Sequence, residues 1–61
     1  MNIAKKIAAL RKKIGLSQKD FAAELKTTQK VVSDYETGKS KPTLQRLPLI
    51  AKILGVTVDT I

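Results

Sequence analysis

Apolar residues recur through the first fourteen positions at a spacing typical of one helix. Successive members of the set are 4, 3 and 4 residues apart, so they fall on one stripe of a helical surface. The stripe comprises Ile3, Ile7, Leu10 and Ile14. Asn2 can cap the start of this helix, and Gly15 can end it in a left-handed conformation.

Two shorter amphipathic segments follow in close succession. Ser17 is placed as the N-cap of the first, and Asp20 stands three residues later, in the position of a capping-box acid. The apolar face of this second helix comprises Phe21, Ala22 and Leu25.

The third predicted helix begins at a threonine cap, either Thr27 or Thr28, and ends at Gly38. Its inner residues are Val31 or Val32, and Tyr35. Because only Lys26 and the threonines separate the second and third helices, the two must cross at a large angle rather than lie antiparallel. This arrangement is a helix-turn-helix, in which the second helix of the pair projects from the body of the domain.

The fourth predicted helix contains a proline that limits where it can begin. Pro42 opposes any helical continuation before it, and Thr43 can cap the new helix. Pro48 lacks an N–H donor, so we expect a turn or 3₁₀ segment through 44–47 and a regular helix from about Pro48 onward. The apolar face of this helix comprises Leu47, Ile50, Ala51 and Leu54.

The C-terminal end predicts one further helical fragment. Gly55 can end the fourth helix, and Thr57 can cap a last fragment over 58–61. The apolar residues here either form a self-association surface or complete the monomer core; they are Leu54, Val56, Val58 and Ile61. No segment alternates long enough to predict a strand. We therefore expect an all-α fold, a compact bundle of four helices plus a short C-terminal helical turn, forming one domain over residues 1–61.

Composition narrows the possible functions. The chain has 61 residues, neither cysteine nor histidine, and 12 Lys and Arg against 5 Asp and Glu, giving a net charge of +7. The missing residue types remove disulfides, thiolate metal sites and the commonest general base, so we predict no enzyme, metal or cofactor. The charge is either a general surface property or a sign of a polyanionic partner. No apolar run approaches ~18 residues and no secretory signal is visible, so we expect a cytoplasmic protein without a membrane span.

The third helix carries polar residues of the types that read DNA bases. Its outward face consists of Gln29, Lys30, Ser33 and Asp34. Glutamine can bond adenine through two hydrogen bonds, lysine donates to guanine, serine is adaptable, and a carboxylate can accept from cytosine. The alternative is an ordinary solvated helix face.

Possible phosphate anchors flank this helix. Gln18 lies at the start of the second helix, where free backbone N–H groups favour an anion. Lys39 and Lys41 follow the third helix directly. Base-reading residues between phosphate anchors are the arrangement that DNA recognition needs, although each lysine alone can be a solvated charge.

Three motifs together resemble the lambdoid phage repressor and Cro family, an XRE-like group of helix-turn-helix proteins. They are LRKKIGLSQKDFA at 10–22, TTQKVVSDYETGKSKP at 27–42 and LQRLPLIAKILGVTVD at 44–59. The resemblance covers nearly the whole chain. It implies a lambda-repressor-like fold and a double-stranded DNA-binding transcriptional regulator of bacterial or phage origin. The recognition helix, about 28–36, would enter the major groove. A homodimer, formed either in solution or only on DNA, would bind a palindromic operator.

The resemblance also implies roles for individual residues. Base contacts fall to Gln29, Lys30 and Asp34, with Ser33 as a weaker candidate. Phosphate contacts fall to Gln18, Thr28, Lys39, Ser40 and Lys41. Arg11 and Glu36 match a structural ion pair that ties the first helix to the end of the third.

The sequence departs from the family's pattern at three places. Lys26 stands in the inter-helix turn, where the family usually has glycine, and a positive φ there would strain the backbone. Asp34 places a negative charge where a neutral or basic group is more common, so it either reads a cytosine or rejects wrong sequences. The last helical segment is short, and in the family this region often serves dimerisation.

Two other classes of function compete with the DNA-binding regulator. The stretch VVSDYETGK is also similar to multiprotein bridging factors, so a protein-binding module, such as a transcriptional coactivator or the DNA-binding part of an antitoxin, is the alternative. A cationic membrane-active peptide needs one continuous amphipathic helix, which Gly15, Gly38 and Pro42 interrupt.

Overall fold

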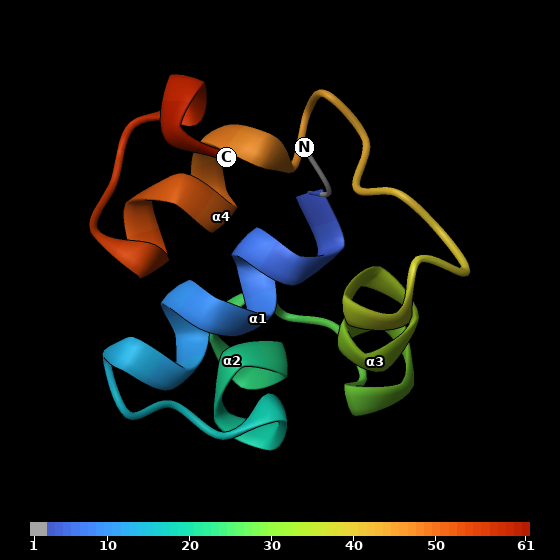
Figure 1. The fold of residues 1–61 in the computed structure, drawn as a ribbon. Coiled ribbons are helices and arrows are strands. Elements are labelled where there is room, and N and C mark those ends of the chain that lie inside the picture. Colours follow the sequence, from blue (N-terminus) through green and yellow to red (C-terminus); the bar gives the residue numbers. More distant parts are fainter. Residues whose placement is uncertain (1–2) are drawn as a thin grey trace.

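Four α-helices and a final 3₁₀ turn make up the fold in the computed structural model, which describes residues 3–61 (Figure 1). The elements are α1 (Ile3–Lys13), α2 (Gln18–Glu24), α3 (Gln29–Thr37), α4 (Leu47–Leu54) and η1 (Val58–Thr60). The all-α prediction of four helices plus a C-terminal turn is confirmed. The predicted cap at Asn2 lies outside the described residues.

Helix α1 turns most of its predicted apolar stripe toward the core, since Ile7 is fully buried and Ile3 and Leu10 pack against the core cluster. Its buried residues are Ala4, Ile7 and Arg11. Ile14 is 45% exposed, because α1 ends at Lys13 and Gly15 turns the chain away with a φ of 78°. The prediction that Ile14 belongs to the buried stripe was therefore wrong. Arg11 is buried beside this stripe, where it pairs with Glu36 of α3.

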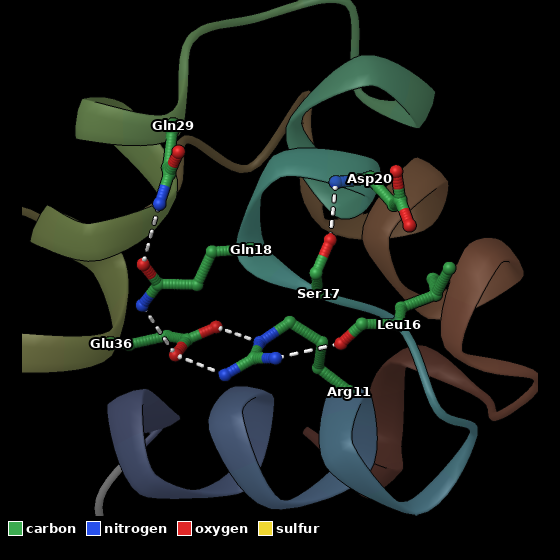
Figure 2. Close-up of polar contacts among 7 residues, drawn as sticks. All are labelled: Arg11, Leu16, Ser17, Gln18, Asp20, Gln29 and Glu36. Carbon is green, nitrogen blue, oxygen red and sulfur yellow. Dashed lines mark hydrogen bonds and ion pairs between the residues drawn. The ribbon is translucent and has the colours of Figure 1, made fainter.

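The two helices of the central pair begin at the predicted caps. The backbone N–H of Asp20 donates to the hydroxyl of Ser17 at 3.0 Å (Figure 2). The backbone N–H of Val31 donates to the hydroxyl of Thr28 at 3.4 Å. These bonds satisfy N–H groups that have no partner inside a helix. Thr28, rather than Thr27, is thus the cap of α3.

A strained turn joins α2 to α3. Lys26 has a φ of 57° and is the one non-glycine residue of the described range with a positive φ. The turn is held by the N–H of Thr27, which donates to the carbonyl of Ala22 at 2.9 Å. The side chain of Ala22 is buried and small, so it lets the two helices pack closely. The turn is therefore specified by hydrogen bonding and packing, although its backbone conformation suits glycine better.

The core lies where all four helices meet. Its fully buried large side chains are Phe21, Ile7, Leu25, Ile50 and Val32. Leu54 is also buried, and Val56 and Ile61 pack against this cluster, whereas Val58 remains 43% exposed. Three of the four apolar residues at the C-terminal end thus complete the monomer core, which was one of the two predicted alternatives.

Helix α4 begins one residue before the predicted proline, after a turn over 44–46. The carbonyl of Thr43 accepts hydrogen bonds from the N–H groups of Arg46 and Leu47 at 3.0 and 3.2 Å. The N-cap is Arg46 and no side chain caps the helix, so the predicted cap by Thr43 was wrong. Pro48 falls in the first turn, where its missing N–H leaves no hydrogen bond unmade.

Thr57 was predicted to cap the last helical fragment with its side chain, and this prediction was wrong. Thr57 precedes η1 as expected, but its side chain makes no capping bond to the backbone. Its hydroxyl instead shares a hydrogen bond of 3.1 Å with the hydroxyl of Thr60.

The strained turn yields a test of stability. Replacing Lys26→Gly should raise the free energy of unfolding by about 1 kcal/mol, because glycine adopts a positive φ without steric cost. For a domain of this size the midpoint of thermal unfolding should rise by roughly 4–8 °C. Lys26→Ala is the control, since it removes the charge but keeps the Cβ. An equal gain in both variants would assign the effect to charge rather than to backbone strain.

Candidate nucleic-acid interface

Helix α3 lies at the edge of the molecule and divides into an inner and an outer face (Figure 1). Val32 and Tyr35 are buried in the core. On the other side, Gln29 and Lys30 are exposed, and Ser33 and Asp34 are half-buried. The structure therefore leaves Gln29 and Lys30 open to solvent and Ser33 and Asp34 partly accessible.

The candidate base reader Gln29 touches the candidate phosphate anchor Gln18. The Nε2 of Gln29 lies 3.5 Å from the Oε1 of Gln18, at the outer limit of a hydrogen bond (Figure 2). The Nε2 of Gln18 in turn donates to the Oε1 of Glu36 at 3.0 Å. Because a carboxylate only accepts, the amide nitrogen of Gln18 must face Glu36, which leaves its oxygen toward Gln29. The hydrogen bond to Glu36 thus fixes the orientation of the Gln18 amide.

Arg11 and Glu36 lie together at the base of this chain of contacts. The Nε of Arg11 donates to the Oε2 of Glu36 at 2.6 Å, and its Nη2 donates to the Oε1 at 3.0 Å. Its Nη1 donates to the carbonyl of Leu16 at 2.7 Å. The side chains of Arg11 and Glu36 are only 9% and 7% exposed. This buried, two-point ion pair connects α1, the segment before α2, and α3, and it holds Arg11 away from solvent.

The environment of Glu36 favours its charged form. Burial raises the pKa of Glu36, but hydrogen bonds from Arg11 and Gln18 and the charges of Arg11 and Lys12 lower it by more. The pKa of Glu36 therefore lies below its ordinary value of 4.5. A carboxylate with two hydrogen-bond donors and a buried cation stays ionised at neutral pH.

The remaining predicted phosphate contacts lie at the two ends of α3. Thr28 is exposed at the N-terminal end, where its hydroxyl is engaged in capping. Lys39, Ser40 and Lys41 are exposed in the loop after Gly38, whose φ of 83° ends the helix. The N–H of Ser40 donates to the carbonyl of Asp34 at 3.3 Å, so this loop folds back on α3. Their roles toward DNA stay predictions.

Three contacts were not anticipated from the sequence. The Nζ of Lys30 lies 3.4 Å from the Oδ2 of Asp34, one helical turn away. Their spacing of four residues was the available signal for this pair. The bonds from Gln18 to Glu36 and from Arg11 to the Leu16 carbonyl join residues with no such regular spacing, and no local pattern could have predicted them.

Within residues 3–61 there is no pocket and no group of three or more His, Cys, Asp or Glu side chains that could hold a metal ion. No helix in this range is long and apolar enough to cross a membrane.

Comparison with known families accounts for this arrangement. The family described as "Helix-turn-helix" matches residues 7–61, from the middle of α1 to the end of the chain. The chain belongs to the Cro and repressor type of helix-turn-helix proteins. In this DNA-binding family, α2 and α3 are the two helices after which the fold is named.

Several characterised proteins are similar to this chain. A multiprotein-bridging factor 1 from Candida glabrata is 38% identical over 55 residues, which cover 90% of this chain and 36% of that protein. The HTH-type transcriptional regulator DdrOP3 from Deinococcus deserti is 33% identical over 58 residues, covering 95% and 45%. The HTH-type transcriptional activator BcrR from Enterococcus faecalis is 32% identical over 59 residues, covering 97% and 29%. The chain thus spans less than half the length of each of these relatives.

The helix-turn-helix scaffold gives a prediction about pH. Because the pKa of Glu36 is depressed in the folded protein, its charge stabilises the fold fully above its unfolded pKa near 4.5 and progressively less as pH falls below it. Glu36→Gln should lower the free energy of unfolding at pH 7 by about 3 kcal/mol, since it leaves a buried arginine without a counter-charge. Urea unfolding between pH 7 and pH 3 should show a shallower pH dependence in this variant than in the wild type.

The control for this experiment is Glu24→Gln, which neutralises an exposed glutamate at the end of α2. This variant should keep both the stability and the acid sensitivity of the wild type. A wild-type pH dependence in Glu36→Gln would mean that another carboxylate accounts for the acid sensitivity.

Proposed function

We propose that this chain is a sequence-specific, double-stranded DNA-binding transcriptional regulator that inserts α3 into the major groove. The observation that carries the proposal is the position of Gln29. It stands on the open face of α3, supported from Gln18 by a chain of contacts that begins at a buried ion pair. A side chain held in this way can read a base with little loss of side-chain entropy.

The chemistry of Gln29 suits adenine. One N–H of its amide is directed at Gln18, which leaves the carbonyl oxygen and the second N–H free. Adenine presents a donor at N6 and an acceptor at N7 on its major-groove edge, so both remaining groups can bond to it. The amide of Gln18 still has one N–H for a phosphate, and Lys39 and Lys41 supply positive charge at the other end of α3.

The size of the domain favours a dimer on DNA. Helix α3 has 9 residues and is therefore roughly 14 Å long, enough to face about four base pairs. The longest dimension of the Cα trace is 24 Å, whereas half-sites one helical turn apart are separated by ~34 Å. One copy can read one half-site, so a palindromic operator needs two.

This function places the protein in the cytoplasm of a bacterium or of a phage-infected cell, in contact with DNA. It needs no cofactor, and the family is typically not enzymatic.

A second candidate function is a protein-binding coactivator. The support is the multiprotein-bridging factor among the relatives and the human endothelial differentiation-related factor 1, which is 34% identical over 56 residues. In this case DNA affinity would be weak, without a preferred sequence and with a shallow dependence on salt.

Selection of duplexes from a random pool tests the proposal. The wild type should enrich a palindromic consensus. Gln29→Ala should lose preference at one position of each half-site, because it removes a base contact and not a phosphate contact. Fluorescence anisotropy should give about a tenfold loss of affinity for the consensus and little change for unrelated duplexes.

The phosphate anchors should respond differently. Lys39→Ala and Lys41→Ala should weaken binding to all duplexes alike and should each reduce the slope of log K against log salt by about 0.9. Lys52→Ala is the charge-matched control, because Lys52 is exposed on α4, away from α3 (Figure 1). No enrichment of any sequence by the wild type, together with a shallow salt slope, would favour the coactivator.

A further inference from the structure

An ion pair stands on the face of α3 that the proposed function turns toward DNA. The Nζ of Lys30 lies 3.4 Å from the Oδ2 of Asp34, and the two side chains are 81% and 26% exposed. Asp34 is the more buried member of the pair, and Lys30 extends over it from solvent.

Helix stability does not account for this pair. Exposed ion pairs four residues apart contribute at most about half a kcal/mol, and the order found here, with the cation first, is the weaker one. Lys30 also lies in the first turn of α3 and Asp34 in the last, so each charge opposes the helix dipole. Exchanging the two residues would suit the helix better on all these grounds.

General electrostatics do not account for the pair either. The chain has five acidic residues against 12 basic ones, so its field attracts polyanions. The other carboxylate of α3, Glu36, is turned inward to Arg11. Asp34 therefore puts a negative charge on the proposed DNA-facing side, where it opposes phosphate binding.

We propose that Lys30 and Asp34 act as one donor–acceptor unit that reads a G·C base pair and disfavours other sequences. The inference rests on the proposed function and deepens it. Guanine presents the acceptors O6 and N7 in the major groove, and the paired cytosine presents the N4 donor beside them. Lys30 can donate to the guanine while Asp34 accepts from the cytosine. An A·T pair also presents acceptors and a donor, but in another order, with the N6 donor between the N7 and O4 acceptors, so groups spaced for G·C do not meet their partners there.

The same pair limits binding to unrelated DNA. Non-specific affinity grows with the number of phosphates that lysine and arginine side chains neutralise. A lysine already paired with a carboxylate contributes little net charge to that total. Asp34 thus lowers the non-specific background while it keeps Lys30 over the base edges, which raises the ratio of specific to non-specific affinity.

The test compares Asp34→Asn with Glu24→Gln, a variant that makes the same change in net charge on the exposed end of α2. Both should fold, as checked by thermal unfolding. Asp34→Asn should bind an unrelated duplex several-fold more tightly than Glu24→Gln does, with a salt slope steeper by up to about 0.9. In duplex selection it should lose about tenfold of the preference at one G·C position per half-site, while Glu24→Gln keeps the wild-type consensus.

The exchange variant Lys30→Asp with Asp34→Lys provides a second test at constant net charge. It should keep or raise the midpoint of thermal unfolding, because both charges then suit the helix dipole. It should nevertheless lose the G·C preference, because donor and acceptor have changed places.

The outcomes separate this inference from the proposed function. One outcome is that the wild type enriches a consensus while Asp34→Asn and Glu24→Gln show the same salt slope and base preference. This result would overturn the inference that Lys30 and Asp34 read a G·C pair together, but it would leave the DNA-binding function in place. A G·C preference that survives the exchange does the same. A wild type that enriches no sequence overturns both.

Discussion

The buried ion pair between Arg11 and Glu36 fixes the relation between the scaffold and the surface of this domain. Burying two charges is unfavourable unless their hydrogen-bonding groups find partners. Here both contacts from Arg11 to the carboxylate are made, and its third nitrogen reaches the carbonyl of Leu16. Glu36 receives a further bond from Gln18. No buried side-chain nitrogen or oxygen within residues 3–61 lacks a partner.

This cluster joins three parts of the chain that share no regular sequence spacing. Arg11 belongs to α1, Leu16 and Gln18 lie at the entry to α2, and Glu36 lies in the last turn of α3. A small domain has little core with which to fix the angle between short helices. A geometrically demanding ion pair supplies that angle, because a guanidinium and a carboxylate bond at two points only in one plane. The position of Gln29 over the surface thus follows from a contact in the interior.

The sequence predicted the elements better than it predicted their faces. Caps such as Ser17 and terminators such as Gly38 and Gly55 act locally, so their patterns located α2, α3 and the end of α4. On α1 the apolar spacing placed Ile3, Ile7 and Leu10 correctly, but Ile14 lies beyond the end of the helix, and apolar spacing cannot register the buried Arg11. Thr43 was misjudged because a turn intervenes and α4 takes Arg46 as its N-cap. Thr57 was misjudged because its hydroxyl bonds to that of Thr60 and not to the backbone.

In the candidate site, too, local patterns predicted which residues face outward but not the long-range contacts that support them. Residues expected to face outward from α3 do so, since helical periodicity alone decides this. The support beneath Gln29 was beyond the reach of periodicity, because Gln18 and Glu36 are 18 residues apart in the chain. The resemblance to a known family suggested the pairing of Arg11 with Glu36, but not the amide that connects this pair to the surface.

Two carboxylates two residues apart on α3 show how position decides the role of a side chain. Residues at this spacing point to different sides of a helix. Glu36 faces the interior, where an arginine and an amide hold its charge, and it therefore stabilises the packing of helices. Asp34 faces outward, where its carboxylate pairs with the exposed Lys30 and contributes little to stability. A charge that contributes little to folding and opposes the attraction of a basic domain for phosphate is best explained by discrimination among partners.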